Sequence, residues 1–329
     1  MPQLPLVSLI ITNYNRQSTI AKAIESALQQ DYGNLEVIIS DNCSTDNSDE
    51  IIKKYTNDER VKYYRNETNI GMLLNFKISF EERAKGEFIT IVNSDDELVS
   101  PSFIKDCIKA VLSNDNVVLV KSNFYFAYPN KNVEMNYDNY NRFYKGVIFL
   151  KEMNLSLDFG WAGILLKRDI INNLKIFDTG IIASDYIANF NMLLYGNVCF
   201  TNCIAYKFNV HDDNVGKNTY QIKQVKKILE ELTIFFKKLS LQANAETYTQ
   251  IKQKFDDFYL KSMYTSTYIN NRNDVNEIKI LLHSHCKDEY LSFIQSAEIK
   301  KFNVLYFFPK FGQRVTALKK SIFGLIKAK

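Results

Sequence analysis

The first hundred residues alternate between short, continuously apolar runs and longer segments in which apolar residues recur every three or four positions. The short runs are rich in β-branched residues and have the length of buried parallel strands. The segments between them have helical spacing, as at Ile20, Ala23 and Ile24 after the potential cap Ser18. This alternation predicts an α/β fold with a mostly parallel sheet and right-handed crossovers. The expected strands are Leu6–Thr12, Leu35–Ser40, Val61–Tyr64 and a run that begins at Phe88.

Three of these expected strands run directly into loops rich in Asp and Asn, which begin at Asn13, Asp41 and Asn93. Carboxyl ends of parallel strands meet at one sheet edge, where open α/β sheets bind ligands, so we expect the three loops to form one site. In the third loop, Asp95 and Asp96 follow an amide and a hydroxyl. A divalent cation such as Mg²⁺ or Mn²⁺ is the usual compensation for such a cluster. Taken alone, the same residues also suit a plain turn that caps a helix.

Several protein classes are excluded by what these loops and the composition contain. The loop after the first expected strand has no glycine, which argues against a dinucleotide-binding fingerprint, and no glycine-rich phosphate loop with lysine follows elsewhere. The five cysteines are scattered and form no disulfide framework, which favours a reduced cytoplasmic compartment. No apolar run reaches the ~20 residues that span a bilayer. Residues 299–329 hold eight of the 41 basic residues and no acidic one, so the net charge of +4 gives no indication of nucleic-acid binding by the rest of the chain.

At this point the motifs resemble a known family, the family 2 inverting glycosyltransferases of the GT-A fold. The resemblance rests on order and spacing over roughly residues 5–100, and a weaker match continues to about residue 216. The segments that carry it are Val7–Asn15, Asp41–Asp46, Asn69–Gly71 with Asn75, Gly86–Ile89 and Asn93–Asp96, followed by Gly163–Arg168, Phe177-Asp178, Ser184-Asp185, Gly196 and His211.

The resemblance implies a donor site for a nucleotide sugar, most simply a UDP-sugar. Asp41 would accept a hydrogen bond from the imide N–H of the base, Thr12 and Tyr14 would pack around the base, and Asn15 and Asn93 would contact base or ribose. Asp95 would bind Mn²⁺ or Mg²⁺, which His211 would help to hold. The full set of implied nucleotide-sugar residues is Thr12, Tyr14, Asn15, Asp41, Asn69, Asn75, Asn93 and Ser94.

The resemblance also implies the groups on the acceptor side. Inversion requires a base opposite the leaving group, and Asp185 occupies the matching position. The pair Ser184-Asp185 is also a good helix start, and both roles can hold, since a helix N-terminus keeps an aspartate ionised. Asp96 and Trp161 are the further acceptor-side candidates.

Asn93 departs from the family pattern, which usually has aspartate at this position. Two alternatives therefore stay open beside the transferase. One is a catalytically inactive relative that binds nucleotide or glycan. The other is a nucleotidyltransferase, which also combines a parallel sheet with acidic metal ligands but usually has a glycine-rich basic loop after the first strand.

The pattern changes from Tyr220 onward to amphipathic helices, expected over about 220–239, 246–269 and 274–282. We expect a GT-A catalytic domain over 1–218 (nucleotide-sugar half about 1–100, acceptor half about 101–218), a helical extension over 219–298 and a basic amphipathic tail over 299–329. The tail has the pattern of an interfacial membrane helix, with a core or dimer helix as the alternative. The expected protein moves a sugar to a glycan or lipid-linked acceptor of bacterial surface polysaccharide synthesis, at the cytoplasmic face of the inner membrane and without nucleic acid.

Overall fold

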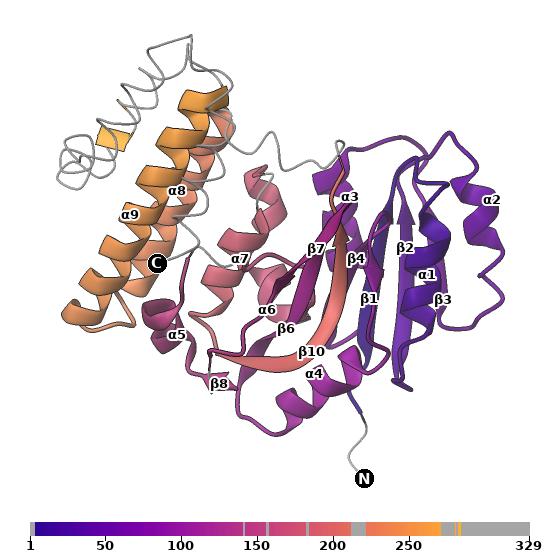
Figure 1. Ribbon diagram of the computed structural model, residues 1–329, viewed down its shortest axis with the longest axis horizontal. Helices are drawn as coiled ribbons and strands as arrows, with labels where there is room; N and C mark the ends of the chain where they lie inside the picture. Colours follow the sequence, from indigo (N-terminus) through magenta and orange to yellow (C-terminus); the bar gives the residue numbers. More distant parts are fainter. Residues whose placement is uncertain are drawn as a thin grey trace. The chain divides into compact units, whose positions relative to one another are not determined.

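The computed structural model describes residues 4–140, 142–155, 158–181, 184–211 and 222–270, together with 280, 282 and 283. The described residues fall into two compact units (Figure 1). Within these limits, the first unit takes Met1–Leu150 and Phe159–Gly216, and the second takes Lys151–Asp158 and Lys217–Lys329. The domain boundaries expected from the sequence stay a prediction.

The first half of the first unit follows the strand–helix order that the sequence predicts. Each expected strand is present, and the helical periods lie between them. The elements are β1 (Val7–Asn13), α1 (Ile20–Leu28), β2 (Leu35–Asp41), α2 (Ser48–Lys53), β3 (Val61–Arg65), α3 (Met72–Ile78), the π-helical turn Ser79–Arg83 and β4 (Phe88–Asn93).

The second half of this unit adds longer strands and short helices. β6 (Val117–Tyr128) and β10 (Asn197–Asn209) are its long strands, and they lie parallel to each other. The other elements are β5 (Glu97–Leu98), α4 (Phe103–Leu112), β7 (Lys131–Met135), β8 (Phe143–Tyr144), α5 (Gly146–Glu152), β9 (Ile164–Lys167), α6 (Arg168–Asn173), a 3₁₀ turn at Ile176–Thr179 and α7 (Ser184–Met192).

All described strands of the first unit join one mixed sheet (Figure 1). Eight of them follow the order β3-β2-β1-β4-β9-β6-β10-β5, while β7 pairs with β6 and β8 pairs with β10. The four strands of the first half are parallel to one another, and β9 lies antiparallel between β4 and β6. The central strands are apolar on both faces because helices cover them; Leu9, Ile10 and Ile11 of β1 have no exposed surface. The predicted α/β architecture is therefore confirmed.

In the second unit, α8 (Ile222–Leu239) and α9 (Ala245–Asn270) match the first two predicted amphipathic helices. The apolar stripe of α8 is buried, and Phe235 packs in a stack against Phe255 of α9. The third predicted helix lies largely outside the described residues, and the tail 299–329 lies wholly outside them.

The described residues include no helix that is both long enough and apolar enough to cross a bilayer.

Candidate active site

The carboxyl ends of β1, β2 and β4 lie side by side at one edge of the sheet. In the parallel register Asn13 is opposite Asp41, and Thr12 is opposite Asn93. Since the three strands run in the same direction, the loops that follow them begin at the same edge. The structure therefore brings together the loops that the sequence predicts to form one site.

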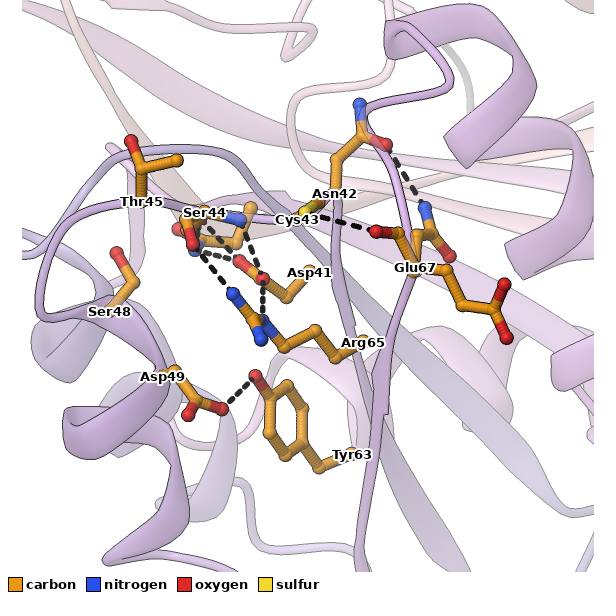
Figure 2. Close-up of polar contacts among 12 residues, drawn as sticks. Asp41, Asn42, Cys43, Ser44, Thr45, Ser48, Asp49, Tyr63, Arg65 and Glu67 are labelled. Carbon is orange, nitrogen blue, oxygen red and sulfur yellow. Dashed lines mark hydrogen bonds and ion pairs between the residues drawn. The ribbon is translucent and has the colours of Figure 1, made fainter.

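Asp41 lies next to Ser44 and Arg65 at this edge (Figure 2). Its side chain has no exposed area. One carboxylate oxygen accepts hydrogen bonds from Asn13 Nδ2 (2.7 Å) and from the Ser44 hydroxyl, and the other accepts one from the Ser44 backbone N–H (2.9 Å). Arg65 Nε lies 3.4 Å from the second oxygen. As placed, Asp41 shapes the loop after β2, and its contact with a base stays a prediction.

Asn15 joins the loop after β1 to the loop after β2. Its backbone N–H donates to Ser44 Oγ (2.9 Å), and its side-chain Oδ1 accepts from the Thr45 backbone N–H (2.8 Å). Asn15 has a left-handed backbone with φ 52°, which asparagine tolerates better than most residues. The side-chain oxygen predicted to contact base or ribose is thus used between the two loops.

Gln17 repeats this reciprocal arrangement two residues later. Its backbone N–H donates to Asp46 Oδ2 (2.9 Å), and its Oε1 accepts from the Asn47 backbone N–H (2.9 Å). Between Asn15 and Gln17, the backbone N–H of Arg16 donates to Ser48 Oγ (3.2 Å). The backbone from 15 to 17 is therefore tied at three consecutive residues.

Two further predicted donor residues, Asn69 and Asn75, belong to a network of amides. Asn69 Oδ1 accepts from Asn42 Nδ2 (2.8 Å), and the buried Asn75 Oδ1 accepts from Asn66 Nδ2 (3.0 Å) and from Ser40 Oγ (2.6 Å). These bonds fix the segment between β3 and α3 against the end of β2. Their contact with a nucleotide sugar stays a prediction.

The predicted base-packing residues offer accessible surface. Tyr14 has 43% of its surface exposed, and Thr12 is half-buried at the end of β1. An exposed aromatic ring beside a polar sheet edge is suited to stack on a planar base. Ser94, by contrast, is only 5% exposed.

The two predicted metal ligands lie together. His211 Nε2 is 3.0 Å from Asp95 Oδ2, and Arg16 Nε is 3.4 Å from the same oxygen. The other oxygen, Oδ1, has no hydrogen-bond partner among the described residues. Within the part of the chain that the structure describes, no group of three or more His, Cys, Asp or Glu side chains converges on one point. The protein itself thus supplies a carboxylate and an imidazole at this position.

Asp96 points the other way, into the interior, and is 2% exposed. Its Oδ2 accepts hydrogen bonds from Tyr206 OH (2.8 Å) and Asn93 Nδ2 (3.0 Å), and its Oδ1 accepts one from the Asn209 backbone N–H (2.7 Å). Burial, with the nearby Asp95 charge, raises the pKa of Asp96 to about 7. Asp96 thus anchors the end of β10; an acceptor-side role stays a prediction, and this buried placement does not favour it.

The same contacts explain why asparagine suits position 93. Its amide Nδ2 donates to the Asp96 carboxylate. An aspartate there would place a second carboxylate against a buried one, and like charges in a site of low polarity repel strongly. Asn93 is therefore compatible with an intact site.

On the acceptor side, Asp185 lies in the first turn of α7 and is half-buried, with Oδ1 accepting from the Tyr186 backbone N–H (3.0 Å). Trp161 is half-buried as well. Its ring stacks on Phe80 at a centroid distance of 5.3 Å, and its Nε1 donates to Asn189 Oδ1 (3.2 Å). The helix start predicted at Ser184-Asp185 is confirmed, whereas the roles of Asp185 and Trp161 toward an acceptor stay predictions.

The structure adds residues to the site that the sequence analysis did not single out. Arg16 contacts Asp95, Arg65 contacts Asp41, and Tyr206 and Asn209 hold Asp96. Arg16 could have been found from the sequence, because it follows directly on the Asn-Tyr-Asn loop of β1. Tyr206 and Asn209 lie more than a hundred residues from Asp96 and carry no local signal.

The fold is of the α/β class, with polar loops gathered at the carboxyl edge of the sheet, and comparison with known proteins identifies the family. The model of glycosyl transferase family 2 matches residues 8–174, about half of the chain, and the chain belongs to this family. The prediction of the family is confirmed.

Among solved structures, S. aureus TarS 1–349 in complex with UDP-GlcNAc matches with a TM-score of 0.61 at 16% identity, covering 87% of this chain and 79% of that one. The mannosyltransferase PcManGT from Pyrobaculum calidifontis, in complex with GDP-Man and Mn²⁺, matches with a TM-score of 0.54 at 14% identity, covering 99% and 87%. At these identities the likeness shows the fold, and the predicted GT-A fold is confirmed.

A curated relative is the GalNAc(5)-diNAcBac-PP-undecaprenol beta-1,3-glucosyltransferase of Campylobacter jejuni. It is 27% identical over 198 residues, which are 60% of this chain and 55% of the relative. The chain spans about half, or less, of the length of the first curated relatives that it matches.

Proposed function

We propose that the protein is a metal-assisted, inverting glycosyltransferase that moves a sugar from a UDP-sugar to a glycan or lipid-linked acceptor in bacterial surface polysaccharide synthesis. The observation that carries the proposal is the pairing of Asp95 with His211 at the sheet edge where β1, β2 and β4 end. Support for the donor comes from the fold shared with TarS, which was solved with UDP-GlcNAc. Support for the acceptor comes from the C. jejuni relative, whose name specifies an undecaprenol-linked substrate.

The residues present fit a hard divalent cation. Asp95 offers a carboxylate with 19% of its side chain exposed and Oδ1 without a partner among the described residues, and His211 offers a ring nitrogen beside it. Carboxylate and imidazole are ligands that Mn²⁺ accepts, and Mg²⁺ prefers the carboxylate. A cation held here would stabilise negative charge on the departing diphosphate. The likeness to PcManGT, solved with Mn²⁺, supports the same choice.

In the proposed reaction an acceptor hydroxyl attacks the anomeric carbon on the face opposite the diphosphate. The bond between that carbon and the diphosphate oxygen breaks, and Asp185 takes the proton of the hydroxyl. The position of Asp185 in the first turn of α7 supports this role, since the positive end of the helix dipole keeps the carboxylate ionised and able to accept a proton. Tyr14 and Thr12 would bind the base at their exposed surface.

The cytoplasmic location, the membrane contact through residues 299–329 and a homodimer remain parts of the proposal. The tail lies outside the described residues, so its support is its basic, amphipathic sequence alone. The alternative of an inactive relative, motivated by Asn93, predicts nucleotide-sugar binding without turnover.

The test is a screen of UDP-glucose, UDP-galactose, UDP-GlcNAc, UDP-GalNAc and GDP-mannose with Mn²⁺. We expect one UDP-sugar to stabilise the protein against heat and to be hydrolysed slowly in the absence of acceptor. A nucleotidyltransferase would instead consume UTP and a sugar 1-phosphate. Failure of every nucleotide sugar to bind would overturn the proposal.

A further inference from the structure

Arg16 has a fixed backbone and a loosely held side chain. Its own N–H donates to Ser48 at the start of α2. The N–H groups of its two neighbours donate to Ser44 and Asp46 in the loop after β2. Its carbonyl oxygen accepts the first turn of hydrogen bonds before α1, from the N–H groups of Thr19 and Ile20. The position from which the side chain extends is therefore set by the two loops.

The guanidinium of Arg16, in contrast, makes only weak contacts. Nε lies 3.4 Å from Asp95 Oδ2, and Nη1 lies 3.5 Å from the carbonyl oxygen of Asn15. Both distances are at the long limit for a hydrogen bond. Among the described residues the guanidinium makes no other hydrogen bond or ion pair, so Nη2 and part of Nη1 keep their N–H donors, and the side chain is 31% exposed. A planar fork with free donors suits the paired oxygens of a phosphate.

The charges around Asp95 suggest when these donors are used. Arg16 approaches the carboxylate oxygen that also faces His211. A divalent cation on Asp95 would bring two positive charges close to the guanidinium and remove the reason for the Arg16–Asp95 contact. The long contact and the partly exposed side chain make the Arg16 guanidinium easy to displace, while its fixed backbone would keep it beside the cation.

We propose that Arg16 binds the diphosphate of the donor and that, before the donor and cation arrive, it serves as the counter-ion of Asp95. The inference rests on the proposed function and adds a residue and a sequence of events to it. Its distinctive consequence is that one substitution at Arg16 changes the affinities for the cation and for the donor in opposite directions. Loss of the guanidinium removes a cation that competes for Asp95 and also removes a phosphate ligand.

The experiment measures Mn²⁺ alone, UDP with Mn²⁺ and uridine by titration calorimetry on the full chain, with wild type and Arg16→Met. Affinity for Mn²⁺ alone should rise about three- to fivefold, the range of an exposed ion pair. Affinity for UDP should fall about ten- to hundredfold, as for a lost charge-assisted hydrogen bond. Uridine, which has no phosphate, should bind both proteins alike.

Two further variants keep the test sharp. Arg16→Lys retains the charge without the fork and should fall between the other two proteins for UDP. Arg60→Met breaks another partly exposed Arg–Asp pair, with Asp58, and should leave the affinities for Mn²⁺ and UDP unchanged. If wild type binds UDP but Arg16→Met binds Mn²⁺ and UDP with wild-type affinities, the role proposed for Arg16 is contradicted. If wild type binds no UDP in Mn²⁺, the proposed function fails first.

Discussion

Asp95 and His211 are 116 positions apart in the chain, yet the imidazole Nε2 of one lies 3.0 Å from the carboxylate Oδ2 of the other. Hydrogen bonds between residues close to each of them explain this proximity. Asp96, beside Asp95, accepts the backbone N–H of Asn209, and the Asn209 side chain donates to the Asp95 carbonyl oxygen (2.7 Å). The end of β10 is thereby fixed to the loop after β4, and His211 follows two residues later.

If this attachment positions the metal ligands, Tyr206→Phe should weaken metal binding although Tyr206 is not one of those ligands. The substitution removes the hydroxyl that donates to Asp96 Oδ2 (2.8 Å) and accepts from the Asn93 N–H (3.2 Å). We expect a loss of stability of about 1–2 kcal/mol, together with about tenfold weaker Mn²⁺ binding, as for other groups that orient metal ligands. Urea unfolding and calorimetry measure the two effects.

Tyr32→Phe is the matched control for this variant. Tyr32 is also buried and donates its hydroxyl to a carbonyl oxygen, that of Pro5 (2.6 Å). It should cost stability without changing Mn²⁺ binding. Equal Mn²⁺ affinities for wild type and Tyr206→Phe would show that Asp96 does not position the ligands.

Cys43 has a left-handed backbone, with φ 62°, in the loop that Asp41 organises. A side chain in this conformation costs about 1–2 kcal/mol, which glycine avoids. Cys43→Gly should therefore stabilise the protein by about 0.5–1 kcal/mol, after the greater freedom of glycine in the unfolded chain is allowed for. Cys43→Ala keeps the strain and should give no gain in thermal unfolding. A less stable glycine variant would mean that the thiol contact with the Glu67 carbonyl oxygen (3.4 Å) outweighs the strain.

Asp185→Asn should separate binding from transfer. The amide cannot take the acceptor proton, so we expect the transfer rate to fall by about 10²–10⁴ while UDP-sugar affinity stays nearly unchanged. Asp169→Asn is a close control, because Asp169 also lies in a first helical turn and accepts the N–H of the next residue (2.8 Å). Near wild-type transfer by Asp185→Asn would remove its role as the base.

Lys254 of α9 gives the second unit a dependence on pH. Burial lowers the pKa of Lys254 from its ordinary 10.5 to about 8, while its Nζ donates to the carbonyl oxygens of Lys151 (2.7 Å) and Met153 (3.0 Å). Between pH 8 and 10.5 the unfolded chain holds this proton and the folded chain does not. The contribution of Lys254 to the free energy of unfolding should therefore rise with pH in this window.

The difference between wild type and Lys254→Met isolates this contribution. Wild type should gain stability relative to the variant as pH rises from about 8 toward 10, the window set by the two pKa values. Lys237→Met, at an exposed position of α8, should give a difference that does not change with pH. A constant difference for Lys254→Met as well would show that its pKa is not lowered.

The succession of strands and helices in the first hundred residues and the meeting of three loops at one edge could be predicted from sequence, because both follow from local patterns. Apolar runs such as Leu6–Thr12 become buried parallel strands wherever helices can cover them, and polar residues after such strands must meet at one edge. Asp95 and His211 were singled out by their positions in the motifs that resemble the family, and the structure places the two side chains together.

The inner arrangement of the site could not be predicted in the same way. Asp95 and Asp96 are adjacent and chemically identical, but one faces the open edge and the other the interior. The difference arises from Tyr206 and Asn209, which reach Asp96 only through the pairing of β10 with β5. Likewise Asp41 and Asn15 have the right chemistry for a ligand, and only the folded loops show their oxygens bound to neighbouring groups.

In the proposed function, Asp95 and His211 hold a divalent cation for a uridine diphosphate donor. Calorimetric titration of UDP in the presence of Mn²⁺ tests it most directly, with wild type, Asp95→Ala and His211→Ala and with a metal-free titration of each protein. The account predicts that Asp95→Ala abolishes the Mn²⁺-dependent part of UDP binding and that His211→Ala weakens it. Unchanged Mn²⁺-dependent affinity in both variants would contradict the account.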